Sequence, residues 1–103
     1  MVELTANYSI YILRCSDGSL YTGIATDVDR RLEEHKAGKR GAKYLRGRWP
    51  ATVVFRQAIG DRSCASRVER RVKKLPRSRK EQLIDGLLKL ESLMSGNQAS
   101  GSA

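Results

Sequence analysis

The sequence predicts a small α+β domain in which helices flank a three-stranded, mostly antiparallel sheet, with the element order ββαβαα. Its 103 residues suit one domain with a modest core. Two segments rich in β-branched and aromatic residues lie close together near the start and are joined by a short turn. Two later segments begin with helix-capping residues and repeat apolar residues at helical spacing. These observations assign residues 1–94 to a single domain with its core at residues 8–84.

The first two strands form a predicted hairpin, at residues 8–15 and 20–25, with the segment SDGS as its turn. A three-residue loop, with Gly18 in the left-handed conformation, pairs Tyr11 with Gly23. Tyr11 and Tyr21 then become diagonal neighbours on one face of the sheet. A two-residue loop instead places the two tyrosines on opposite faces. The length of the loop therefore decides whether the tyrosines can act together.

Caps, apolar spacing and chain breakers define the later elements. After the hairpin the sequence predicts a helix at residues 27–37, a glycine-rich basic loop at 38–50, a strand at 51–58, a helix at 61–75 and a helix at 79–94. Thr26 or Asp27 caps the first helix, and Ser78 caps the last. The last helix has a broad apolar face made of Leu83, Ile84, Leu87, Leu88, Leu90 and Met94. Residues 95–103 lack large apolar side chains and are expected to be disordered.

Positive charge is concentrated in the middle of the chain. The formal net charge is +9, but residues 30–80 hold 18 basic and 4 acidic side chains, whereas the remainder is net acidic. A concentrated basic block attracts polyanions, of which nucleic acid is the commonest. The alternative is a merely soluble basic surface, which the clustering of the charges disfavours.

The cysteines and the N-terminus indicate a reducing compartment. Cys15 and Cys64 form neither a CxxC pair nor a disulfide framework, and a single histidine cannot complete the usual zinc sites. The first residues lack the basic and apolar runs of a signal peptide or membrane anchor. We therefore expect a cytoplasmic protein that does not insert into a membrane.

Charged residues occur on a helix face that should be buried. In the helix at 27–37, Val28 and Leu32 fix the apolar stripe at helical spacing. The same stripe contains Arg31 and His35. Two ionisable groups are therefore aimed at or beside the core.

The helix at 61–75 repeats this pattern, because Glu69 falls inside the apolar stripe formed by Ala65, Val68, Val72 and Leu75. Two explanations stay open for this carboxylate. It forms an internal salt bridge with Arg31, or it binds a hard cation, since one or two carboxylates and phosphate oxygens suffice for magnesium. Phosphodiester hydrolysis needs a metal, a cation such as Arg31 to compensate the phosphoryl charge, and a base, here a tyrosine or His35. The whole set therefore favours chemistry over a simple salt bridge.

These positions also resemble a known family. The segments SIY at 9–11 and YTG at 21–23 resemble the paired motifs of the GIY-YIG nuclease family. DVDRRLEEH resembles the family helix that carries an invariant arginine, here Arg31, with His35 following it. SRVERRVKKL is similar to the helix that carries the metal-binding glutamate, here Glu69. The resemblance covers about residues 8–84 and is greatest to the small, stand-alone bacterial YhbQ-like (UPF0213) branch.

The resemblance implies a metal-dependent endonuclease that hydrolyses phosphodiester bonds of DNA with a single Mg²⁺ or Mn²⁺ ion. Tyr21 would be the general base or the group that orients the water, and Tyr11 would support the nucleophile site. Arg31 would bind the phosphate, and His35 would help to position a tyrosine hydroxyl. Glu69 would hold the metal.

Substrate contacts are expected from open space and from charge. Gly23, opposite Tyr11, would leave room for the substrate backbone to come close. The loop GAKYLRGRWP interleaves basic and aromatic residues, which suits phosphate contacts and base stacking, although Tyr44 and Trp49 could instead pack over the sheet edge. The predicted nucleic-acid contacts are Lys39, Arg40, Lys43, Tyr44, Arg46, Arg48, Arg70 and Lys73.

Two other classes of function stay open. A nucleic-acid-binding module of the same fold would keep the basic surface but cut poorly, and a ribosome-associated basic protein would explain the charge but not the site. The intact set of site residues favours the enzyme, because a pure binder does not need a carboxylate that repels phosphate. With so little recognition surface, we expect the protein to read the structure or backbone of DNA rather than its sequence.

Overall fold

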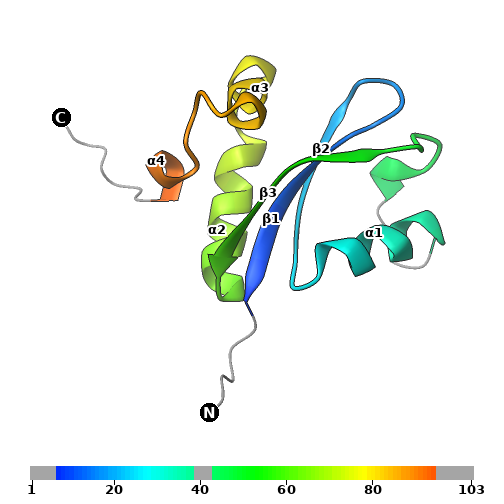
Figure 1. The fold of residues 1–103 in the computed structure, drawn as a ribbon, viewed down its shortest axis with the longest axis horizontal. Helices are drawn as coiled ribbons and strands as arrows, with labels where there is room; N and C mark the ends of the chain where they lie inside the picture. The colour runs from blue at the N-terminus through cyan, green and yellow to red at the C-terminus, as the bar shows by residue number, and fades with distance from the viewer. Residues whose placement is uncertain (1–6, 39–42, 95–103) are drawn as a thin grey trace, which may run out of the picture.

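The fold is a three-stranded sheet with helices on both faces (Figure 1). The computed structural model describes residues 7–38 and 43–94. Along the chain its elements are β1 (Tyr8–Arg14), β2 (Leu20–Ala25), α1 (Val28–Lys36), the 3₁₀ helix η1 (Lys43–Leu45), β3 (Thr52–Gly60), α2 (Arg62–Lys73), α3 (Arg77–Asp85) and α4 (Glu91–Met94). The strand order is β2-β1-β3, and both neighbours run antiparallel to β1. The predicted α+β class and antiparallel sheet are confirmed.

The central strand β1 is buried on both faces. Its residues Ile10 to Leu13 are each at most 1% exposed. Such a strand reads as a continuous apolar run instead of an alternating one. Ile10 and Ile12 pack with residues of α2 and α3, whereas Tyr11 and Leu13 pack with residues of α1 and η1. The two faces of β1 therefore belong to two separate cores.

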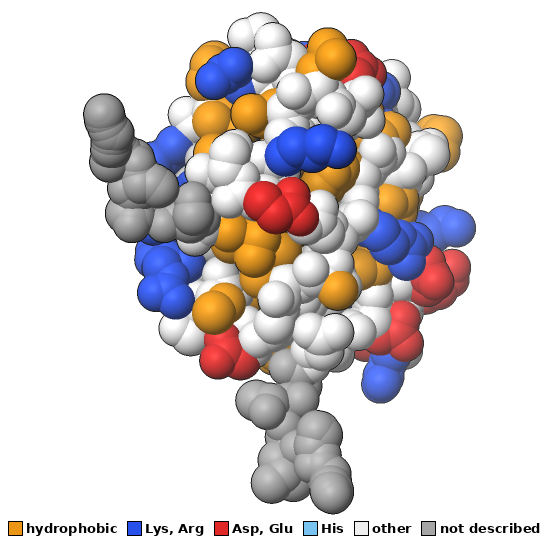
Figure 2. Space-filling model, turned by 60° about the vertical axis from the view of Figure 1, so that its left-hand side comes forward, with side chains coloured by type: hydrophobic (Ala, Val, Ile, Leu, Met, Phe, Trp, Pro, Cys, Tyr) orange, Lys and Arg blue, Asp and Glu red, His pale blue; other side chains and the backbone are white. Residues whose placement is uncertain are grey.

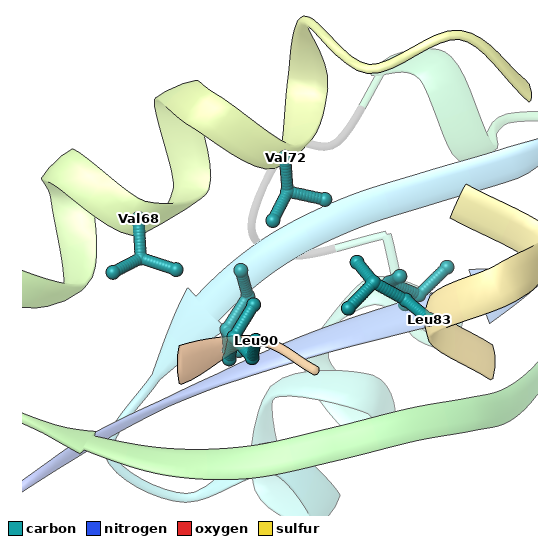
Figure 3. Packing of buried hydrophobic residues seen from close by; sticks show 6 residues of the cluster. Val68, Val72, Leu83 and Leu90 are labelled. Atoms are coloured by element: carbon teal, nitrogen blue, oxygen red, sulfur yellow. The ribbon is translucent and has the colours of Figure 1, made fainter. Parts of the chain in front are cut away.

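The larger core fixes α2 against the sheet. Val68 and Val72 project from α2 toward the strands, where they meet Leu83 of α3 and Leu90, which precedes α4 (Figure 3). All four side chains are at most 3% exposed. Burying an aliphatic side chain of this kind stabilises a fold by about 1.5–3 kcal/mol. This packing sets the rotation of α2, and with it the position of Glu69.

The helices α1 and α2 begin where the capping residues predict. The Asp27 carboxylate accepts a hydrogen bond from the backbone N–H of Arg30 at 3.0 Å. The Asp61 carboxylate accepts one from the N–H of Cys64 at 2.9 Å. Each bond satisfies a backbone donor that the first turn of a helix leaves unpaired. Of the two caps predicted for the first helix, Asp27 is the one that forms.

The predicted last helix at 79–94 is wrong in its extent. The helix α3 begins after Pro76 rather than at Ser78, and it ends at Asp85 because Gly86 adopts a left-handed conformation with φ of 83°. The backbone N–H of Leu87 closes the end by donating to the Gln82 carbonyl at 2.8 Å. As a result Leu87 is 78% exposed and does not join the predicted apolar face.

Two other predictions differ or lie outside the structure. The third strand extends to Gly60 instead of ending at residue 58. The predicted tail at 95–103 lies outside the described residues.

On the side of the molecule that carries α2 and α4, basic, acidic and hydrophobic side chains are interspersed (Figure 2). The positive charge of the chain is therefore not gathered into one continuous patch on this side.

Candidate active site

The hairpin turn brings Tyr11 and Tyr21 onto the same face of the sheet. The loop has three residues, with Gly18 left-handed at φ of 86°, and the N–H of Cys15 donates to the Ser19 carbonyl at 2.9 Å. In this register Tyr11 lies opposite Gly23. The ring centroids of the two tyrosines are 6.5 Å apart, with the planes tilted by 44°. The three-residue alternative, in which the tyrosines can act together, is the one that forms.

Gly23 makes room for Tyr11 and not for the substrate. A Cβ atom at Gly23 would lie 2.5 Å from the Tyr11 hydroxyl oxygen and 2.7 Å from its Cζ atom. The side chain of Tyr11 therefore already fills the space that we expected the substrate backbone to use. Glycine at this position instead allows a tyrosine that is 1% exposed to place its hydroxyl over the neighbouring strand.

The helix α1 supplies Arg31 and His35. Val28 is 5% exposed and anchors the helix, whereas Arg31 and His35 are half-buried. The Tyr11 hydroxyl lies 3.4 Å from Nε2 of His35, and the His35 ring meets the Tyr21 ring edge-on at 6.1 Å between centroids. His35, one of the two ionisable residues in the apolar stripe, thus contacts both tyrosines.

The helix α2 supplies Glu69 from the opposite face of the sheet. The edge strand β2 contacts both α1 and α2, so that groups from the two faces meet there. The Glu69 side chain is 23% exposed, and its Oε2 atom lies 3.2 Å from Nζ of Lys73. Arg31 instead pairs with Glu34 at 3.4 Å. The salt bridge expected between Arg31 and Glu69 is therefore wrong, because each of these two described residues pairs with a neighbour on its own helix.

Electrostatic coupling connects the tyrosines to Arg31 and Glu69. Burial raises the pKa of Tyr11 well above its usual value, the nearby Tyr21 and Glu69 act in the same direction, and Arg31 opposes them. Burial also raises the pKa of Tyr21, which Lys73 and Arg31 counteract and Glu69 reinforces. Of the five predicted catalytic residues, the two tyrosines and His35 therefore contact one another. Arg31, Glu69 and also Lys73 lie near enough to act on the tyrosines electrostatically.

The predicted nucleic-acid contacts divide into three groups. Lys43, Arg46, Arg70 and Lys73 are exposed side chains. Tyr44 and Arg48 are engaged within the chain, since Tyr44 stacks on Tyr21 and the Arg48 guanidinium contacts the Asp17 carboxylate. The remaining two, Lys39 and Arg40, lie outside the described residues. Trp49 is half-buried and packs in the core of α1 and η1, as the packing alternative for this residue predicts.

A cleft borders the site at the start of α1. Its lining consists of Ala25, Thr26, Asp27, Arg30, Arg31 and Glu34. Arg30 was not among the predicted site residues, because it lies off the apolar stripe of α1. Only the position of the helix next to the end of β2 brings it to the cleft. Arg30 and Arg31 therefore line the same cleft.

The donor atoms at the site fit a metal ion whose coordination is completed by substrate and water. Within residues 7–38 and 43–94 no group of three or more His, Cys, Asp or Glu side chains could hold an ion by itself. Mg²⁺ commonly binds one or two carboxylates and completes its octahedron with waters and phosphate oxygens. Glu69 offers one such carboxylate, and it is half-buried but still accessible.

Comparison with known proteins identifies relatives over most of the chain. Residues 7–82 match the GIY-YIG catalytic domain. A UPF0213 protein of Cronobacter sakazakii is 49% identical over 86% of this chain and 93% of its own length. The UPF0213 protein YhbQ of Escherichia coli K12 is 52% identical over 73% of this chain and 74% of its own length. These names state no activity.

Two solved structures have the same fold. The UPF0213 protein BH0048 of Bacillus halodurans is 43% identical and superposes with a TM-score of 0.51, covering 92% of this chain and 99% of that one. The protein EF2693 of E. faecalis is 32% identical and superposes with a TM-score of 0.56, covering 98% of this chain and 100% of that one.

In the described part of the chain, no helix is long and apolar enough to cross a membrane. The chain belongs to the GIY-YIG family, in the UPF0213 (YhbQ-like) branch, and its catalytic domain is of a kind typical of endonucleases.

Proposed function

We propose that this protein is a metal-dependent endonuclease that hydrolyses phosphodiester bonds of DNA and reads the structure of DNA rather than its sequence. The observation that carries the proposal is the contact of Tyr11 with both Tyr21 and His35, close enough to Arg31 and Glu69 for their charges to act on both tyrosines. A guanidinium, a carboxylate and hydroxyl groups that can hold a water are the groups that phosphodiester hydrolysis requires. We place this activity in the reducing cytoplasm, in keeping with two unpaired cysteines, Cys15 and Cys64.

Each site residue has a role that its surroundings support. Arg31 binds the scissile phosphate and compensates the charge that grows on its oxygens during attack. Glu69 holds a single Mg²⁺ or Mn²⁺ ion, which when bound polarises the phosphate and stabilises the leaving oxygen. Lys73 lies 3.2 Å from Glu69 and adds positive charge on the same side.

The two tyrosines have different roles. Tyr11 is 1% exposed, and its hydroxyl lies 3.4 Å from Nε2 of His35, so that it helps to hold the neighbouring site residues in position. Tyr21 is half-buried and is the tyrosine that the attacking water can reach. Burial raises the pKa of Tyr21, so that its hydroxyl is protonated at neutral pH and orients the water through a hydrogen bond. A role as general base requires bound substrate or metal to lower that pKa.

The test is cleavage measured together with binding. Labelled supercoiled plasmid and a panel of branched, nicked and single-stranded DNAs would be incubated with Mg²⁺ or Mn²⁺, and in parallel with a chelator. We expect cutting that the chelator abolishes and that Glu69→Gln lowers by about 10² or more, with DNA binding retained. Glu33→Gln removes the same charge from an exposed position of α1 and serves as the matched control.

The opposite result would support the alternative. Binding that survives chelation and ignores Glu69→Gln, with no cutting of any DNA, indicates a nucleic-acid-binding module that has kept the fold. Cutting of RNA but not of DNA would keep the chemistry and change the substrate. Either outcome would replace the proposal as it stands.

A further inference from the structure

The loop after α1 places an aromatic ring on the proposed catalytic tyrosine. Leu45 of η1 is 1% exposed and anchors this loop in the core. Its neighbour Tyr44 stacks on Tyr21, with the ring centroids 5.7 Å apart and the planes within 25° of parallel. Tyr44 is 41% exposed, so that it covers Tyr21 at the rim of the site. Stacked aromatic pairs stabilise each other beyond the effect of the area they bury.

Arg48 holds Tyr44 in place through several contacts. The Nε atom of Arg48 donates to the backbone carbonyl of Tyr44 at 2.6 Å, and its Cζ atom lies 4.3 Å from the centre of the Tyr44 ring. The end of the same guanidinium binds the carboxylate of Asp17 in the β1–β2 turn. The N–H of Ser16 also donates to the Arg48 carbonyl at 2.9 Å. The loop is therefore tied to the hairpin turn by both backbone and side chain.

We propose that Tyr44 is a positioning residue for Tyr21 and that the pair Asp17–Arg48 is the clamp that holds Tyr44 in place. The inference rests on the proposed nuclease function and concerns the same site. Arg48, whose side chain is 36% exposed, then has a structural role at the rim of the site, although the sequence suggests a phosphate contact. Arg48 already binds a carboxylate, a backbone carbonyl and the face of a ring, so that it has few donors left for phosphate.

The substitution Asp17→Asn separates the two roles of Arg48. Oδ1 of Asp17 accepts hydrogen bonds from the N–H and Oγ of Ser19 at 3.0 and 2.6 Å, and asparagine keeps this acceptor. Only the oxygen that faces Arg48 is replaced, by an amide group that cannot accept. If Arg48 is a clamp, kcat falls roughly tenfold to a hundredfold, while DNA affinity is unchanged or slightly higher. If Arg48 contacts phosphate, the loss of a repelling charge raises affinity and leaves kcat intact, which overturns the proposal.

Variants of Tyr44 test the ring itself. Tyr44→Phe keeps the stacking surface and is expected to keep activity, whereas Tyr44→Ala lowers kcat with little change in KM. A loss of DNA affinity in Tyr44→Ala that exceeds the loss of kcat would instead identify base stacking as the role of this residue. The matched control is Asp29→Asn, because Asp29 forms an exposed ion pair with Arg56 at 3.0 Å and carries the same charge.

A spectroscopic readout separates this inference from the proposed function. The chain has 4 tyrosines, so that the ring signals of Tyr21 can be assigned by NMR. Loss of the stacked ring in Tyr44→Ala, and its release in Asp17→Asn, should shift these signals, whereas Asp29→Asn should not. Unchanged Tyr21 signals in the first two variants would refute the positioning role. If the wild-type protein cuts no DNA, the proposed function fails, while the NMR shifts still decide whether Tyr44 holds Tyr21.

Discussion

The substitution Gly23→Ala should both destabilise the protein and disturb its site. The added Cβ would lie 2.5 Å from the Tyr11 hydroxyl oxygen and 2.7 Å from Cζ, which is closer than carbon and oxygen atoms approach without a bond. Tyr11 is 1% exposed and lies in the core with Leu13 and Val28, so that its ring cannot swing away freely. Moving it would also separate its hydroxyl from His35.

The size of the effect follows from two opposing contributions. Overpacking a well-filled core costs about 1–3 kcal/mol. Alanine in place of glycine in a strand otherwise gains about 0.5–1 kcal/mol of unfolded-state entropy. With both contributions at the middle of their ranges, the net loss in Gly23→Ala is about 1 kcal/mol, which lowers the Tm of a domain of this size by roughly 4–8 °C.

A double-mutant cycle tests whether the Tyr11 side chain is the cause. Urea and thermal unfolding, followed by circular dichroism, would compare Gly23→Ala in the wild type and in Tyr11→Leu, whose side chain ends short of Gly23. We expect the loss in the wild-type background to disappear in the leucine background, where alanine should gain about 0.5–1 kcal/mol. An equal loss in both backgrounds, or no loss in either, would refute the reasoning from the Tyr11 contact.

Three further predictions follow from the charges. Lys73→Met should strengthen Mn²⁺ binding severalfold by calorimetry, because Lys73 competes for the Glu69 carboxylate at 3.2 Å, and equal affinities would count against it. Hydrogen bonds from Arg14 hold the pKa of Glu81 at about 2, below its unfolded value of 4.5, so that stability is lost as pH falls from about 4.5 to 2. This loss should be smaller in Glu81→Gln, measured by urea unfolding at several pH values. Arg31→Lys should lower cleavage by about 10² with folding unchanged, since lysine lacks the planar fork that binds phosphate through two donors.

The sequence predicts the sheet and the first helices well because their signals are local. The left-handed Gly18 and the turn residues set the hairpin, and Asp27 and Asp61 begin α1 and α2. The extent of the C-terminal helix is predicted wrongly because the local signals conflict there. Apolar residues continue at helical spacing beyond Gly86, and this spacing predicts one long helix. Gly86 instead ends α3, although Leu90 beyond it still packs into the core.

The candidate site is predictable where a residue breaks an expected pattern. Arg31, His35 and Glu69 stand out because each lies in an apolar stripe. In the structure His35 contacts Tyr11, and Arg31 and Glu69 lie near enough to influence it electrostatically. Tyr44 gives no such signal for its contact with Tyr21. The two residues are far apart in the sequence, and no local pattern predicts that η1 packs in the core beside Tyr21.

Under the proposed function, the burial of Tyr11 gives a reason for the presence of two tyrosines and a glycine at the candidate site. A single hydroxyl beside Arg31 and Glu69 would have to be both fixed by the core and open to water, and these demands conflict. Here Tyr11 meets the first demand, because Gly23 leaves space for its ring and His35 lies within 3.4 Å of its hydroxyl. Tyr21 is only half-buried and meets the second demand. The rings of Tyr11, His35 and Tyr44, which contact it, hold it in place. Under the proposed function, loss of either tyrosine should therefore impair cleavage in different ways: Tyr21→Phe removes the group that orients the water, whereas Tyr11→Phe loosens the support on which that group depends.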